Sequence, residues 1–260
     1  MLKEYPKRWR SIGMVSVATF VLGILTLSSF SQTVIPFYKA EDFKAEQIDS
    51  LKQLYGNKKK LPQGYELQAL LALSHYPELR DIKVKFKIRK GGAPFVSRPT
   101  VWSTFFKSAP KRNYLIIIRS KPHPMFDPIL LPAMRFNAQV GVLGHELAHT
   151  SDYSKRGFSK MMQVVFGNLS WKFLDEFEFE TDRRAVHHGL GFQILAWSEH
   201  AVKTLRVNEP AEIKGNSKID GIMQRERYMR PATVRKEMSE LAIYDRFDIE
   251  NAKLNEISDK

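Results

Sequence analysis

Hydrophobic and basic residues alternate along residues 81–90, which read DIKVKFKIRK. This period of two predicts a β-strand with one apolar face and one uniformly basic face. Two further strands are predicted at residues 100–106 and 114–120. The second of these, YLIIIRS, shows no polar alternation, and this pattern is typical of an interior strand that is covered on both faces.

In other segments the apolar residues recur at spacings of three and four, which predicts helices. Leucines at these spacings indicate a helix within residues 64–76. Residues 137–153 are apolar on nearly every side, as expected for an interior helix. Residues 170–188 are strongly periodic, and residues 221–229 and 232–243 predict two more helices near the C-terminus.

The N-terminus combines a basic start with a long uncharged stretch. Residues 1–10 contain four basic residues and one acidic residue, and no charge follows from Ser11 to Tyr38. The apolar centre at residues 13–27 is typical of an export signal, which could be cleaved after the small residues within 29–31. The uncharged run is also long enough for a retained single-pass anchor, and a buried core helix is the third interpretation. For signal and anchor alike, the positive-inside rule predicts an exported protein of the cell envelope, either periplasmic or anchored in the membrane and facing outward.

Composition limits the possible chemistry further. The chain has 260 residues, of which 43% are hydrophobic, and this is enough for one sizeable domain with a core. It contains no cysteine, which excludes disulfides, thiolate zinc sites and cysteine nucleophiles. The net charge of +13 favours contact with nucleic acid, anionic lipid or acidic polymers, although a solvated basic surface is the simpler interpretation.

The predicted interior helix contains the pentapeptide His-Glu-Leu-Ala-His. His145 and His149 are four positions apart, so both rings project from one face of the helix, one turn apart. Two imidazole nitrogens can then reach a single tetrahedral ion at about 2.0–2.1 Å. Glu146 lies one step around the helix, which is the position of the general base in a zinc hydrolase.

A catalytic zinc site needs a third protein ligand and an open position for water. The metzincin pattern would place a third histidine six residues after His149, but the chain has Lys155 there. The helix predicted at residues 170–188 offers an alternative, because Glu178 lies next to its inward stripe. Asp182 follows one turn later on the same side, where a carboxylate can accept the free N–H of a ligating histidine and fix its tautomer.

An HExxH motif followed by Glu-x-x-x-Asp on a later helix resembles the gluzincin metallopeptidases. The stretch EFETDRRA is most similar to the E-F-x-A-D-x-x-A pattern of the membrane-associated CAAX prenyl-protein and HtpX-type protease group. The resemblance implies an α+β, zincin-like fold, in which a small mixed β-sheet packs on an active-site helix and a glutamate helix, with C-terminal helices. It implies a Zn²⁺ ion held by His145, His149 and Glu178, with Glu146 as the general base. It also implies that Asp182 is the acidic residue that hydrogen-bonds to a ligating histidine.

The chain departs from that group in two respects. Thr181 stands where the group usually carries alanine, and the chain has at most one candidate membrane span where those proteases have several. Prenyl or membrane substrates are therefore not carried over. The predicted organisation is a signal peptide or membrane anchor at residues 1–31, a polar tether at 32–62, a zincin-like metallopeptidase domain at 63–205, and a helical C-terminal extension with a polar tail at 206–260.

These features predict a zinc-dependent metalloendopeptidase whose protein or peptide substrate lies along an exposed strand edge near residues 100–120. The alternative is a non-catalytic envelope protein with a structural or vestigial zinc site, which binds a membrane or a partner through its basic surface. The intact Glu146 argues against that alternative. A nucleic-acid binder is a third possibility, but no recognised nucleic-acid motif is present, so nucleic acid is not expected as a partner. Tyr153, His187 and His188 are interpreted as structural, and neither an oxyanion-stabilising residue nor an oligomeric state is assigned.

Overall fold

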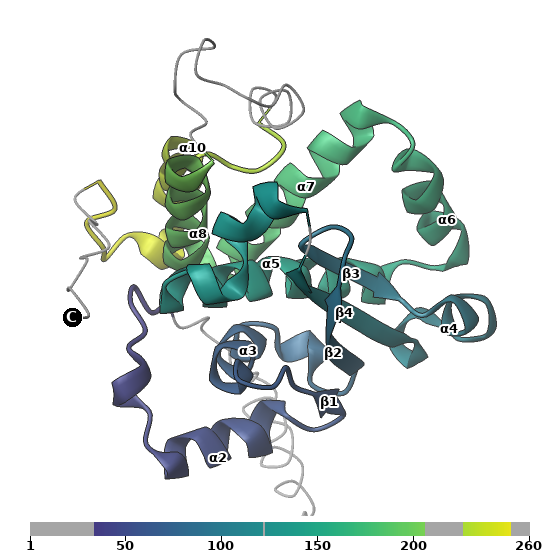
Figure 1. Ribbon diagram of the computed structural model, residues 1–260, viewed down its shortest axis with the longest axis horizontal. Helices are drawn as coiled ribbons and strands as arrows, with labels where there is room; N and C mark the ends of the chain where they lie inside the picture. The colour runs from purple at the N-terminus through teal and green to yellow at the C-terminus, as the bar shows by residue number, and fades with distance from the viewer. Residues whose placement is uncertain (1–33, 122, 206–225, 251–260) are drawn as a thin grey trace, which may run out of the picture. The chain divides into compact units, whose positions relative to one another are not determined.

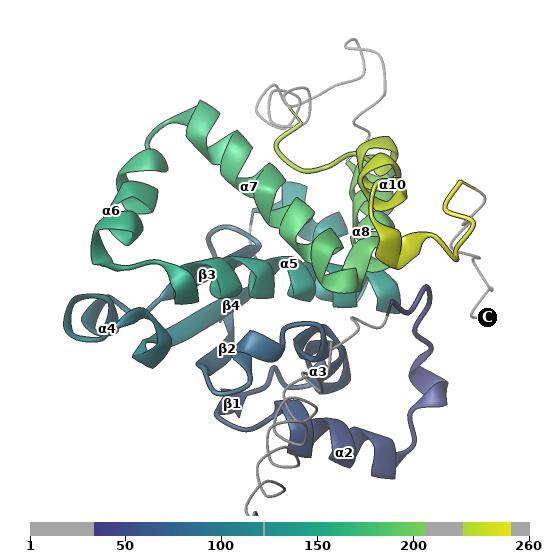
Figure 2. The same cartoon turned by 180° about the vertical axis from the view of Figure 1, so that it is seen from behind.

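The computed structural model describes residues 34–121, 123–205 and 226–250. The fold is α+β, as predicted, with a four-stranded mixed sheet and a larger helical part (Figures 1 and 2). The strands are β1 (Lys59–Lys60), β2 (Lys83–Lys90), β3 (Phe95–Pro99) and β4 (Asn113–Lys121). The α-helices are α2 (Ala45–Tyr55), α3 (Glu66–Ser74), α4 (Val101–Phe106), α5 (Phe136–Lys155), α6 (Phe158–Gly167), α7 (Trp171–Ala185), α8 (Gly191–Thr204) and α10 (Pro231–Ser239). Short 3₁₀ turns lie at Ala40–Asp42, Pro77–Leu79, Ala109–Lys111, Pro124–Ile129, Leu131–Ala133 and Ala242–Tyr244.

The sheet has the strand order β1-β2-β4-β3, with β1, β2 and β4 parallel and β3 antiparallel to β4. Residues 114–118 of β4 are all buried, which confirms the interior strand predicted from YLIIIRS. In β2, Val84 and Phe86 are buried while Lys83 and Lys85 are exposed, which confirms the predicted alternation for this part of the strand. The strand order makes β3 an edge strand, and β3 packs against α5. The exposed strand edge predicted near residues 100–120 is wrong, because these residues form the helix α4 and the interior strand β4.

Residues 101–106 form the helix α4, so the strand predicted there is wrong. Thr100 is the N-cap residue, with an extended backbone, and its hydroxyl donates to the hydroxyl of Ser103 at 2.8 Å. The sequence VWSTFF places its large apolar residues at spacings of one and four, which is the spacing of a helix face and not of a strand. The β-propensity of valine and aromatic residues outweighed this spacing in the prediction, because that propensity assumes a half-buried position in a sheet.

Helix α5 is buried over almost its whole length, as its apolar pattern predicts. It packs against α3, α7 and α8 and against β3 of the sheet (Figure 1). Gly141 permits a close approach to α8, because a Cβ atom at this position would lie 2.1 Å from the carbonyl oxygen of Gln193. Tyr76 fixes the same stretch from the other side, since its hydroxyl donates to the carbonyl oxygen of Gly144 at 2.7 Å. The helical turn that carries the two histidines is therefore held firmly within the core.

Helix α7 continues through the π-helical turn Val186–Leu190 into α8. Gly189 interrupts this turn with a φ of 85°, in the left-handed region that glycine adopts without strain from a Cβ atom. The kink allows α7 and α8 both to pack on α5. Ser170 begins α7 as its N-cap and accepts a hydrogen bond from the backbone N–H of Phe173 at 3.4 Å.

The segments on either side of the predicted zincin-like domain also contain regular structure. Residues 32–62, predicted as a polar tether, include α2, which packs on α3, and β1, which pairs with β2. Helix α10 (Pro231–Ser239) corresponds to the helix predicted at residues 232–243, but it ends at Ser239, and it packs on α8. Residues 226–229 form turns, so the end of the helix predicted at 221–229 is wrong, and the rest of that prediction lies outside the described residues.

The predicted export signal or anchor at residues 1–31 also lies outside the described residues, as does the chain after residue 250. Among the helices of residues 34–121, 123–205 and 226–250, none combines the length and the apolar character needed to cross a bilayer.

Candidate metal centre

Two histidines on α5 form the first half of the site. His145 and His149 are both buried, and they lie one helical turn apart. Their rings meet edge to face, with centroids 4.8 Å apart. The four-residue spacing within a regular helix produces this arrangement, because side chains at positions i and i+4 lie on the same face.

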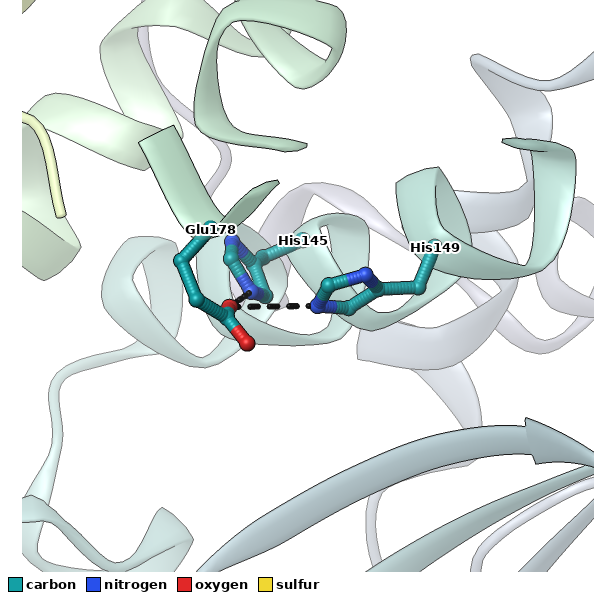
Figure 3. A group of neighbouring side chains, drawn as sticks. All are labelled: His145, His149 and Glu178. Atoms are coloured by element: carbon teal, nitrogen blue, oxygen red, sulfur yellow. Dashed lines mark hydrogen bonds and ion pairs between the residues drawn. The ribbon is translucent and has the colours of Figure 1, made fainter. Parts of the chain in front are cut away.

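Glu178 on α7 provides the second half. One of its carboxylate oxygens, Oε2, lies 3.1 Å from Nε2 of His145 and 3.2 Å from Nε2 of His149 (Figure 3). All three possible ligand atoms lie within 4.8 Å of one another. The structure thus brings together the three residues that the sequence proposed as ligands, and the group could hold a metal ion.

Asp182, one turn beyond Glu178, fixes the ring of His145 from behind. Its Oδ1 atom lies 2.7 Å from Nδ1 of His145 and accepts the ring N–H. Its other oxygen accepts the backbone N–H of Met229 at 2.9 Å, so the carboxylate is held at both ends and is 1% exposed. With Nδ1 engaged in this way, Nε2 of His145 is directed toward Glu178.

Thr181 holds the ring of His149 through its Nδ1 atom, as Asp182 holds the ring of His145. The Thr181 hydroxyl donates to the carbonyl oxygen of Phe177 at 2.8 Å, so its oxygen can accept the Nδ1–H of His149 at 3.2 Å. In the sequence, Thr181 lies on the inward stripe of this helix and departs from the alanine of the resembling families, but no role at the site was predicted for it. The helical spacing from Glu178 was the available signal, since a residue three positions later lies on nearly the same face.

The charges of the cluster stabilise one another. Burial opposes the charged form of His145, but the carboxylates of Asp182 and Glu178 outweigh that effect and raise the pKa of His145 well above its usual value. Burial also opposes the charged form of Glu178, but His149 and His145 outweigh it and lower the pKa of Glu178 well below its usual range. A cation at this position would take over the role of the histidine proton as the partner of the carboxylate.

Glu146 lies beside the cluster, and one of its carboxylate oxygens is unpaired among the described residues. Its side chain is buried, and its Oε2 atom has no hydrogen-bond partner among the described residues. Burial raises the pKa of Glu146 above its usual value. A buried carboxylate oxygen without a partner is costly, and costs of this kind are concentrated at functional sites.

A cavity of about 250 Å³ lies against His145 and Glu146. Its wall is mostly apolar, and it is formed by the start of β3, the 3₁₀ turn Pro124–Ile129, α8 and the segment at residues 227–230. The side chains nearest to an apolar ligand in it would include Phe95, Phe126, Val142, Trp197 and Leu205. The site therefore combines a polar cluster with an apolar chamber beside it, as small-molecule and peptide sites usually do.

Tyr228 also lines this cavity, and the sequence gave no signal for it. Its ring centroid lies 5.7 Å from that of His145. Burial, together with the negative charge of Glu178, raises the pKa of Tyr228 well above its usual value, so the phenol stays protonated and can donate a hydrogen bond. No motif surrounds Tyr228, and it follows a stretch of chain far from the pentapeptide, so only the fold relates it to the histidines.

The other residues weighed as candidates have contacts of their own. The ring of Tyr153 stacks on that of His149, with centroids 5.9 Å apart, and its backbone carbonyl accepts the hydroxyl of Tyr114. His187 pairs with Glu237 at 2.7 Å, and His188 lies 3.0 Å from a carboxylate oxygen of Glu78. These contacts agree with the structural roles expected for the two histidines that follow α7.

Comparison with protein-family models, with curated proteins and with solved structures finds no match to this chain. The function is therefore argued from the side chains of the site and from the chemistry that they can perform. Fold-level analogy adds little in any case, because one fold can support many activities.

Proposed function

We propose that this protein is a zinc-dependent metalloendopeptidase, in which His145, His149 and Glu178 hold the ion and Glu146 acts as the base. The observation that carries the proposal is the contact of one Glu178 oxygen with Nε2 of both histidines. Two imidazoles and a carboxylate are a donor set of catalytic zinc sites, which keep a fourth position open. The resemblance of the two motifs to those of gluzincins supports the same assignment.

The donor set fits zinc in both chemistry and spacing. It contains nitrogen and oxygen, and the chain has no cysteine that could add sulfur. Ligands at about 2.0–2.1 Å from a tetrahedral ion are about 3.3 Å from one another. The separations of 3.1 and 3.2 Å between Glu178 and the two histidines are close to that value, and all three ligand atoms lie within 4.8 Å of one another. The chemistry that zinc supplies in such a site is a lowered pKa for water and the polarisation of a carbonyl oxygen.

Glu146 would move the proton in the reaction. Its unpartnered oxygen can accept a proton from the attacking water, and the carboxylic acid can then deliver that proton to the leaving amine. The raised pKa of Glu146 brings the group nearer to neutral pH, where one carboxyl can both accept and return a proton. Bond cleavage then leaves one new carboxylate and one new amine, with water consumed.

Tyr228 would stabilise the negative charge that develops on the substrate oxygen. Its phenol remains protonated because burial raises its pKa, and its ring lies beside that of His145 on the wall of the cavity. A donor fixed before the reaction stabilises such charge more strongly than water does, since no reorganisation is needed. This assigns a role that the sequence left open.

The outer edge of β3 would bind the substrate backbone. The backbone N–H of Thr100 donates to Asn113 of β4 at 2.8 Å, which identifies the residues that face β4. In an antiparallel pair only alternate residues face the partner strand, so the backbone groups of Phe95 and Ser97 point to the outer edge. An extended peptide could add there as a further strand, and the apolar cavity would accept one apolar side chain of it.

The test is the hydrolysis of an unfolded, fluorophore-quenched protein by Glu146→Gln at full zinc loading. We expect zinc to be retained and cleavage to be lost, because the amide cannot accept the proton. The matched control is Glu176→Gln, which removes an exposed glutamate from α7 and should leave both quantities unchanged. Cleavage by Glu146→Gln at the rate of the unchanged protein would refute the mechanism.

The alternative function has a distinct outcome in the same assay. Zinc bound by the unchanged protein, with no hydrolysis of any unfolded protein or peptide, would favour a structural or vestigial site. The unpartnered oxygen of Glu146 is the observation against that outcome, since a purely structural site has no use for it. Export to the cell envelope stays a prediction from the sequence, because the segment that carries it lies outside the described residues.

A further inference from the structure

Helix α4 has the reverse of the usual side-chain distribution of a surface helix. It buries its two polar residues, Ser103 and Thr104, and exposes its four large apolar residues. Trp102 and Phe106 are 77% and 74% exposed, and their rings stack with centroids 5.6 Å apart. A surface helix of a soluble domain normally turns its apolar stripe to the core and its polar side to water.

Helix α6 extends the same surface. The ring of Phe158, at its start, lies 5.5 Å from that of Phe105, and both views place α4 and α6 at the same side of the fold (Figures 1 and 2). Helix α6 turns Met161 and Val164 to the core and presents further apolar residues outward. The exposed apolar face consists of Val101, Trp102, Phe105, Phe106, Phe158, Val165, Phe166 and Leu169. Large apolar residues that gather in water on one side of a fold mark a site of interaction.

The two segments of the chain that carry this face contain basic residues and no acidic ones. Residues 98–113 and 155–174 carry the face, and each contains four lysines or arginines and no aspartate or glutamate. The eight basic residues are Arg98, Lys107, Lys111, Arg112, Lys155, Arg156, Lys160 and Lys172. Six of them, Arg98, Lys107, Lys111, Lys155, Lys160 and Lys172, are exposed. Lys155 lies 3.6 Å from Glu78 and Lys172 lies 3.9 Å from Glu176, so the other four are the basic residues that the proposal uses. The partner of the face must therefore offer an apolar interior together with negative charge at its boundary.

We propose that the exposed apolar face of α4 and α6 docks on the surface of an anionic lipid bilayer. Tryptophan and phenylalanine insert at the boundary between headgroups and acyl chains, and the surrounding lysines bind the anionic headgroups. A second copy of this chain is a poorer occupant, because a symmetric contact would bring two basic rims together. The inference does not rest on the proposed peptidase activity, since no residue of the metal cluster takes part in it.

The absence of cysteine from the chain allows a test at a single labelled position. Phe106→Cys in the full chain, labelled with an environment-sensitive fluorophore, should shift to the blue and lose quenching by aqueous iodide when vesicles of phosphatidylcholine and phosphatidylglycerol are added. Gln53→Cys on α2, also exposed, is the control and should remain open to iodide. The comparison of positions tests the face itself, whatever the N-terminal segment contributes to vesicle binding.

Three further variants serve as a repeat measurement, a test of the basic residues and a control. Phe166→Cys on α6 repeats the measurement if the first variant folds poorly, as judged by circular dichroism. Lys107→Gln combined with Lys111→Gln and Lys160→Gln should weaken insertion of the label on the order of a hundredfold, at about fivefold for each lysine near an anionic surface. Glu146→Gln should insert like the unchanged chain, which separates this proposal from the peptidase proposal.

Three results would overturn the proposal. The label at position 106 could stay as open to iodide as the label at position 53 when anionic vesicles are present. It could insert equally well into vesicles of phosphatidylcholine alone, which would remove the role of the basic rim. It could also be shielded before vesicles are added and become exposed on dilution, which would identify a second copy of the chain as the occupant.

Discussion

The candidate metal centre (His145, His149 and Glu178, with Glu146 beside them) and the exposed apolar face of α4 and α6 both depart from the usual distribution of residues, in opposite directions. Between α5 and α7, ionisable side chains lie in the core; on α4 and α6, large apolar side chains lie in water. The polar inversion is compensated inside the fold, because His145 has Asp182 and His149 has Thr181 as a partner. The apolar inversion has no such compensation among the described residues.

The difference shows where each region needs something from outside the chain. In the candidate metal centre a partner is needed at two neighbouring places. One is the unpaired oxygen of Glu146, and the other is the point between Glu178 and the two histidines where an ion could bind. In the apolar face the need is spread over a whole surface. Departures of this kind from the expected pattern are tolerated mainly at functional sites, so the first suggests a small ligand and the second an extended partner.

Removal of Glu178 should have the largest effect on the cluster. Glu178→Ala leaves only two ligands, so we expect zinc affinity to fall by more than about a hundredfold, beyond what the loss of a supporting residue costs. Glu176→Ala on the same helix is the matched control, because its side chain is exposed. A competition titration with a fluorescent chelator measures both. Unchanged zinc binding by Glu178→Ala would remove α7 from the site.

Tyr228→Phe should lower the rate of peptide hydrolysis by about 10²–10³ with little change in KM, as the loss of one fixed oxyanion donor does. Zinc content should stay the same, since the phenol is not a ligand. Tyr55→Phe, on α2 away from the cluster, serves as the control. An unchanged kcat for Tyr228→Phe, with zinc bound, would show that the phenol contributes only packing against His145.

Asp182→Asn should weaken zinc binding by about 10–100-fold, because the neutral amide polarises and orients the His145 ring less than the carboxylate does. Thr181→Ala removes the corresponding acceptor of His149, and we expect a smaller loss, because a neutral hydroxyl has less influence than a charge. The two affinities, measured by the same chelator titration, rank the supports of the cluster. An equal or larger loss for Thr181→Ala would reverse the assigned importance of the two contacts.

The sequence predicted the cluster better than it predicted the apolar face, for a physical reason. His145, His149, Glu178 and Asp182 lie on two helices, and helical spacing determines which side chains share a face before the tertiary fold is known. Glu178 could be paired with the histidines because a catalytic zinc site needs a third ligand and Glu178 lies next to the inward stripe of the later helix. Thr181 lies on the inward stripe of the same helix, but no role as a support of His149 was predicted for it.

Tyr228 and α4 could not be obtained in this way. Tyr228 lies outside the described helices and strands and far from α5 in the sequence, and no periodicity relates it to α5. Residues 101–106 were predicted as a strand because their side chains favour sheets, and only the fold shows that these side chains face outward. Predictions from residue patterns assume that apolar residues are inside, and they fail where a surface is made for another partner.

The hydrogen bonds of the partly buried Glu78 allow the contribution of a charged polar contact to stability to be measured at residues that are not candidate metal ligands. His188 and Ser151 hydrogen-bond to its carboxylate and, against the opposing effect of burial, lower the pKa of Glu78 to about 2. A carboxyl whose pKa is lowered on folding stabilises the fold above its unfolded pKa and loses that contribution as the pH falls. Glu78→Gln should therefore lower the free energy of unfolding at pH 6 by on the order of 1 kcal/mol, and the difference should shrink toward pH 2. Urea unfolding at several pH values measures this; a difference that grows in acid would contradict it.

The smallest expected effect belongs to the apolar face, and it sharpens the comparison most. Phe106→Ala should change the free energy of unfolding by less than about 0.5 kcal/mol, because the side chain is already in water. The same change at Phe86, which is 2% exposed in β2, should cost about 3–5 kcal/mol. Urea unfolding of both variants makes the comparison, and a large cost at Phe106 would mean that another part of the chain covers the face. A neutral Phe106→Ala that also inserts poorly into anionic vesicles would assign this aromatic ring to binding and not to folding.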